Sequence, residues 1–145
     1  MSKPKVMVAL RDSVSVQSLM DLGCQLAHGM GADLVALHIV EVPLLTPLDV
    51  IDETLDRHGK EVLAQAKRAA EKLSVSISTE LIRAREAGEA IVGTGKEQGV
   101  DLLVIGHHKP HSLALSDALL GGIVQYVAHH ASCRVIVQIP APDRK

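Results

Sequence analysis

Apolar residues along the chain gather in five short runs, each separated from the next by a longer stretch with helical spacing. The runs span Lys5–Leu10, Leu34–Val40, Val75–Ile82, Leu102–Ile105 and Val135–Ile139. Most consist almost wholly of Val, Leu, Ile and Ala, a pattern typical of parallel strands buried on both faces. The third run alternates apolar and polar residues, so we expect a less buried strand there.

The stretches after the first two strands predict helices. The first helix begins at a cap provided by Ser13 or Ser15 and ends at Gly29 or Gly31. Its apolar face is expected to consist of Leu19, Leu22, Leu26 and Met30, with Gly23 and Ala27 beside them. The second helix, 49–73, has acidic residues at its start and basic residues at its end, which complements the helix dipole. Its apolar face is expected to consist of Leu55, Val62, Ala66, Ala69, Ala70 and Leu73.

Two shorter helices complete the alternation, at Glu86–Gln98 and from Gly121-Gly122 to His130. Strands alternating with helices predict an α/β fold: a doubly wound, five-stranded parallel sheet with helices on both faces, here a single domain over residues 1–145. In such sheets ligands bind beyond the carboxyl ends of the strands, where strand order reverses. We therefore expect three strand ends to converge on one site: Leu10-Arg11-Asp12, Ile39-Val40, and Gly106 with the loop after it.

Composition narrows the possible functions. Phe and Trp are absent and Tyr126 is the sole aromatic residue, which argues against binding single-stranded nucleic acid by base stacking. The formal net charge of −2 gives no basic surface for DNA or RNA. The apolar runs are too short for a bilayer-spanning helix or a signal peptide, so no membrane insertion is expected. Cys24 and Cys133 have no paired spacing, and we expect a cytoplasmic protein with two reduced thiols.

The loop between Gly106 and Gly122 carries the strongest binding signal. It leaves a strand at its carboxyl end and leads into the start of a helix. Unpaired backbone N–H groups and the helix dipole favour a phosphate at such a place. The loop residues that can add positive charge or bare N–H groups are His107, His108, Lys109, His111 and Gly121.

Other chemistry is less favoured. The loop histidines lack the three or four converging ligands of a metal site, so we interpret them as titrating residues of an exposed loop. His38, inside an apolar strand, is expected to be a hydrogen-bonded core histidine. The sequence has no Gly-x-Ser-x-Gly elbow, P-loop or catalytic Cys motif, so no catalytic residue is assigned and weak ATP hydrolysis is the least favoured function.

Several segments together resemble the universal stress protein family over residues 4–139. They are VALRDS after the first strand, ALHIVE at the second, GEAIVGTGKEQGVDLLVIG before the loop and LLGGIVQYVAHHASCRVIVQ at the end. The resemblance implies an adenine nucleotide alpha hydrolase-like fold, a stress-response role and a homodimer. It also implies bound ATP or AMP, with a nucleotide-bound Mg as the one metal. The implied contacts come from Leu10, Arg11, Asp12 and Ile39 for the base, and from Gly106, Lys109, Gly121 and Gly122, with His107 beside them, for the phosphates.

The loop departs from the nucleotide-binding members, which read Gly, two residues, Gly, nine residues, Gly, then Ser or Thr. Here Lys109 stands at the position of the second Gly, and eleven residues rather than nine separate it from Gly121. Gly122 stands at the position of the Ser or Thr, and Arg11 stands where the nucleotide-binding members carry Asp. Some members with Gly-His-His at this place do not bind ATP, and the loop also resembles stress-protein domains attached to cation/proton antiporters. The alternative is therefore a dimeric interaction module without nucleotide, acting on a partner such as a membrane transporter.

The last strand gives the expected dimer contact. The run Arg134–Ile139, followed by Pro140, is predicted to lie at an edge of the sheet. An apolar edge is a pairing hazard unless it is covered. Antiparallel pairing with the same strand of a second copy would cover it and produce a two-fold dimer.

Overall fold

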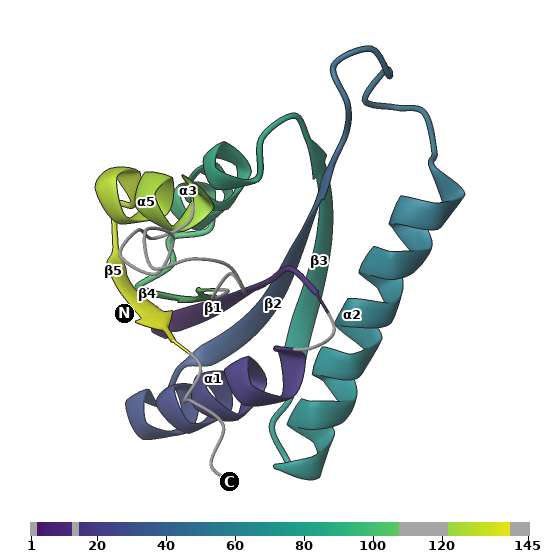
Figure 1. Ribbon diagram of the computed structural model, residues 1–145. Helices are drawn as coiled ribbons and strands as arrows, with labels where there is room; N and C mark the ends of the chain where they lie inside the picture. Colours follow the sequence, from purple (N-terminus) through teal and green to yellow (C-terminus); the bar gives the residue numbers. More distant parts are fainter. Residues whose placement is uncertain (1–2, 13–14, 108–121, 140–145) are drawn as a thin grey trace, which may run out of the picture.

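The computed structural model describes residues 3–12, 15–107 and 122–139. Strands β1 (Lys5–Leu10), β2 (Asp33–Glu41), β3 (Ile77–Ala84), β4 (Leu102–Gly106) and β5 (Arg134–Gln138) form one sheet. Its order is β3-β2-β1-β4-β5, and every neighbouring pair is parallel (Figure 1). The predicted five-stranded parallel α/β fold is confirmed, and β5 lies at a sheet edge as expected.

Among the described residues, the helices that cover the sheet are α1 (Val16–Met30), α2 (Glu53–Lys72), α3 (Ala87–Glu97) and α5 (Gly122–His130). The helices α1 and α2 lie on one face, and α3 and α5 lie on the other (Figure 1). The central strand β1 sends Val6 and Val8 to the α1–α2 side and Met7 to the α3–α5 side, and all three are fully buried. Both halves of the core are therefore built on β1.

Local sequence signals explain where the helices begin and end. The Asp52 carboxylate accepts hydrogen bonds from the N–H groups of Thr54 and Leu55, at 3.0 and 3.1 Å, and so caps α2. Gly31 ends α1 in the left-handed conformation, with φ of 62°. A Cβ at Gly23 would lie 2.5 Å from Val8 Cγ2, so the glycine lets α1 approach β1 closely.

Several predicted boundaries were wrong. The helix α2 begins at Glu53 rather than Asp49, because Asp52 is its cap. Strand β3 spans 77–84 rather than 75–82, because the Val75 N–H bonds to the Ala70 carbonyl and so completes the end of α2. Ser15 occupies the cap position of α1, but its side chain makes no cap hydrogen bond; Ser13 lies outside the described residues.

The buried helix faces also differ from the prediction. Met30 in α1 is 40% exposed, and Leu22 and Leu26 are half-buried, because the face centred on Gly23 packs closest to the sheet. The buried residues of α1 are Val16, Leu19, Met20, Gly23, Cys24 and Ala27. In α2 Leu55 is half-buried and Leu73 lies exposed beyond the helix end. The apolar part of the α2 face is Val62, Leu63, Ala66, Ala69 and Ala70.

Tyr126 joins α5 to α3. A Cβ on Gly88 would lie 3.0 Å from the tyrosine ring, so the ring rests on the bare backbone of α3. The other neighbour of the ring is His130, stacked at 4.1 Å between centroids with Nδ1 2.9 Å from the Tyr126 carbonyl oxygen. Both His129 and His130 lie in the last turn of α5, the end of a helix at which the dipole favours positive charge.

Candidate functional site

A cavity of about 750 Å³ opens at the carboxyl ends of β1, β2 and β4. The chain moves outward from β1 to β2 and β3, then crosses back to β4 and β5 on the other side of β1. The cavity therefore lies where strand order reverses, the usual ligand position in such sheets. Its lining includes these residues singled out from the sequence: Leu10, Arg11, Asp12, Ile39, Gly106, His107 and Gly122. Lys109 and Gly121 lie outside the described residues.

The cavity has one apolar and one polar part. Its apolar lining, drawn largely from the carboxyl ends of the strands and the starts of α3 and α5, includes Ala9, Leu37, Ile39, Ala87, Ile91, Ile105, Ile123 and Val124. Its charged side chains include exposed Arg11, half-buried Asp12 and exposed Glu41. The Ser15 hydroxyl lies 3.5 Å from Asp12 Oδ1 and donates to it. Such a cavity suits a ligand with a flat apolar part and a polar part.

The first turn of α5 forms part of the cavity wall. Gly122 is the first helical residue and lines the cavity, followed by Ile123 and Val124. The first N–H groups of a helix lack intrahelical partners, and the dipole adds partial positive charge there. A Cβ at Gly122 would meet no atom of the described residues within 4 Å.

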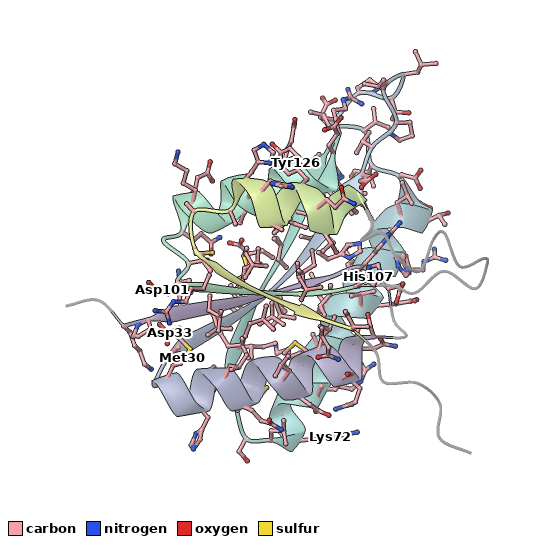
Figure 2. All side chains as sticks on the ribbon, turned by 60° about the vertical axis from the view of Figure 1, so that its left-hand side comes forward. Met30, Asp33, Lys72, Asp101, His107 and Tyr126 are labelled. Atoms are coloured by element: carbon pink, nitrogen blue, oxygen red, sulfur yellow. The ribbon has the colours of Figure 1, made fainter. Side chains whose placement is uncertain are left out.

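The exit from β4 is held on the cavity wall. The His107 N–H donates to the Gln138 carbonyl at 2.9 Å, and the Gln138 side chain donates to the Ser18 hydroxyl. A Cβ at Gly106 would lie 3.1 Å from Leu19 Cδ1, so this glycine lets α1 approach the strand end. His107 is only 6% exposed, so the expectation of an exposed loop histidine was wrong for this residue. Figure 2 shows His107 at the opposite end of the sheet from Asp33 and Asp101.

Two histidines close the cavity beside β1. His38 is 5% exposed and its Nδ1–H donates to the Leu10 carbonyl at 2.9 Å, which confirms the predicted hydrogen-bonded core histidine. The His58 ring lies 5.7 Å from it, edge to face, with Nε2 3.4 Å from the Arg11 carbonyl. Burial lowers the pKa of His38; the bond to Leu10 opposes this shift, and His58 adds to it. His38 is therefore a neutral group of the wall at neutral pH.

Sequence reasoning missed His58, Glu41 and Gln138, which also line the cavity. Glu41 and Gln138 end β2 and β5, so the rule that sites gather at carboxyl strand ends could have found them. His58 lies on α2, and its place depends on how that helix crosses the sheet. Gly59, the next residue, packs against His38 and Leu81, and this close approach brings His58 to the cavity.

Neither a metal site nor a membrane-spanning helix is found in the described ranges. Among residues 3–12, 15–107 and 122–139, no group of three or more His, Cys, Asp or Glu side chains is arranged to hold a metal ion. No helix in that part of the chain has the length and apolar character to cross a membrane. Cys24 is buried and Cys133 half-buried, and both are free thiols, as expected.

Comparison with known proteins gives the family. A universal stress protein of Synechocystis sp. is 33% identical over 91 residues, which cover 63% of this chain and 81% of the relative. A universal stress protein solved in complex with cAMP superposes with a TM-score of 0.74 at 20% identity, covering 95% of this chain and 98% of that one. The universal stress protein of Archaeoglobus fulgidus solved with dAMP gives 0.71 at 18% identity, covering 94% and 97%. The family profile matches residues 4–138, and the chain belongs to the universal stress protein family.

Proposed function

We propose that this protein binds an adenine nucleotide, ATP or AMP, in the cavity at the carboxyl ends of β1, β2 and β4, and serves as a cytoplasmic stress-response module. The observation that carries the proposal is a cavity that joins an apolar recess to the first turn of α5, where a helix has N–H groups without intrahelical partners. The structural neighbours solved with dAMP and cAMP support it.

The base lies at the carboxyl ends of β1 and β2, near Leu10, Arg11, Asp12 and Ile39. The phosphates lie toward Gly106, His107 and Gly122, where the start of α5 meets the end of β4. Lys109 and Gly121 are proposed to contact the phosphates as well. Arg11 is exposed at the rim, so its guanidinium can reach a phosphate without a desolvation cost. A magnesium ion enters only with the nucleotide.

Substitution of Gly122 tests the site. Gly122→Glu adds a carboxylate at the cavity wall, where like-charge repulsion should weaken ATP and AMP by about tenfold or more, or ~1.4 kcal/mol. The matched control is Gly93→Glu, the same exchange at an exposed helical glycine with no atom within 4 Å of its Cβ. Titration calorimetry should show a loss of affinity in the first variant alone. Equal binding by both, or wild-type affinity no better than millimolar, would refute the proposal.

A homodimer through β5 is part of the proposed module. Strand β5 lies at the sheet edge and its residues are half-buried apart from Arg134, while Ile139 just beyond it is 55% exposed. Ile139→Lys should raise the dimer dissociation constant by about tenfold or more, because it places charge against apolar surface. Leu73→Lys, at an exposed leucine far along the chain, is the control. Sedimentation velocity measures both, and a wild-type monomer at all concentrations would contradict the dimer.

The second candidate function is an interaction module that acts on a protein partner, for which the exposed apolar residues after β2 are the specific observation. A membrane transporter is one such partner. Weak ATP hydrolysis ranks last, and no residue is proposed as its base. Failure to bind nucleotide would leave the interaction module as the favoured function.

A further inference from the structure

The connection between β2 and α2 exposes a row of large apolar side chains. We call residues 42–52 the arm; Figure 1 shows it as the blue segment that rises past the end of the sheet. Leu45 is 99% exposed, Leu44 84% and Ile51 67%, and Leu48 and Val50 are also exposed. These five make up most of the exposed large apolar residues in the described part of the chain. Exposed apolar clusters of this kind mark interaction surfaces.

The arm is a built structure. The Arg85 guanidinium donates hydrogen bonds to the Pro43 and Thr46 carbonyls, and the Val42 N–H donates to the Ala84 carbonyl at 2.8 Å. Two turns follow, closed by Thr46 N–H to Pro43 O at 2.9 Å and Val50 N–H to Pro47 O at 3.2 Å. These hydrogen bonds hold the arm backbone in place at its base, so less conformational entropy is lost when a partner binds.

Charge around the arm selects the partner. Glu41, Asp49, Asp52 and Glu53 are all exposed at its base or along it. The sequence contains no Lys or Arg from Asp12 to Asp56, and Arg85, which bonds to two arm carbonyls, adds one positive charge against these four carboxylates. An apolar surface bordered by carboxylates is repelled by an anionic bilayer and attracted by cationic side chains.

The hollow between α1 and α2 of a second copy fits the arm poorly. The hollow between α1 and α2 has Arg68 and Lys72 at its edge, but it measures about 270 Å³ and its other lining includes polar Gln17 and Gln65. Leucine side chains gain little from such a polar surface. The complementary surface is apolar with a cationic border, which an amphipathic helix with a leucine face and flanking lysines provides.

We propose that the arm is a docking element for a protein whose surface presents an apolar face bordered by lysine or arginine. This inference goes beyond nucleotide binding, because none of the five apolar arm residues lines the cavity. Leu44, Leu45 and Ile51 contact the apolar face, and Asp49 and Glu53 pair with the cations around it.

The test uses a fluorescent helical peptide with leucines on one face and lysines on its flanks, and a second peptide with glutamates in place of the lysines. Anisotropy titration should show that the lysine peptide binds and the glutamate peptide does not. Leu44→Ser/Leu45→Ser should weaken binding by about tenfold or more, since each buried leucine contributes over a factor of ten. Leu73→Ser, at another exposed leucine, is the control. Leu44 and Leu45 are solvent-exposed, so circular dichroism and thermal unfolding of the double variant should match wild type.

Each other outcome overturns the proposal. Equal affinity for the two peptides would show that charge does not select the partner. Unchanged peptide affinity in the double serine variant would show that the arm does not bind it. Self-association that the double variant abolishes in sedimentation velocity assigns the arm to a second copy. Flotation with phosphatidylcholine vesicles that the variant abolishes assigns it to lipid. None of these results depends on ATP or AMP binding, which calorimetry follows separately.

Discussion

Replacing Gly59 by alanine should destabilise the protein, although alanine favours helix. The residue lies within α2, and a Cβ there would be 2.4 Å from Leu81 Cδ1 and 2.8 Å from His38 Cδ2. Leu81 is half-buried and its methyl group can turn away. The His38 ring cannot move as easily, because it is buried and hydrogen-bonded to the Leu10 carbonyl.

The magnitude follows from two opposing effects. Overpacking a close contact costs about 1–3 kcal/mol. Alanine in place of glycine within a helix returns about 1 kcal/mol. We therefore expect a net loss of about 1 kcal/mol in the free energy of unfolding, with ~2 kcal/mol as the upper end. In a chain of this size that lowers Tm by roughly 2–8 °C.

Urea and thermal unfolding measure the effect, and Gly93→Ala is the matched control. Gly93 also lies in a helix, yet its Cβ would meet no atom within 4 Å. The control should raise stability by up to about 1 kcal/mol, so the two variants should move in opposite directions. If Gly59→Ala is as stabilising as Gly93→Ala, α2 does not pack on His38 as described.

Two further predictions concern charged groups. Because burial lowers the pKa of His38, this histidine takes up a proton in the unfolded chain before it does so in the folded one, so stability should fall as pH drops below about 6.5. The variant His38→Gln should flatten the slope of unfolding free energy against pH, and an unchanged slope would contradict the buried position. Arg83 pairs with the buried Asp56 carboxylate, so Arg83→Gln should lower the free energy of unfolding in urea by about 3 kcal/mol, because it leaves a buried charge unpaired. The double variant Asp56→Asn/Arg83→Gln should lose less, and equal losses would argue against the pair.

The fold followed from short-range signals. Runs such as KVMVAL and LVALHIV predicted buried parallel strands, and the carboxyl-end rule predicted that Leu10, Ile39 and Gly106 share one site, where all three line the cavity. The misses came from tertiary contacts. Periodicity favoured Leu22 and Leu26 as the α1 core, but Gly23 fits against Val8 and rotates the buried face toward Met20 and Cys24. Likewise the sequence predicted an exposed loop residue at His107, but this residue is buried and its N–H donates to the Gln138 carbonyl of β5.

Because Tyr126 is the sole residue among Phe, Trp and Tyr, the protein carries one intrinsic fluorophore, which lies between Gly88 and His130. Its emission reports on the contact between α3 and α5, four residues after the proposed phosphate-binding glycine. With so little ultraviolet absorption of its own, a purified sample would also reveal any retained purine directly in its spectrum.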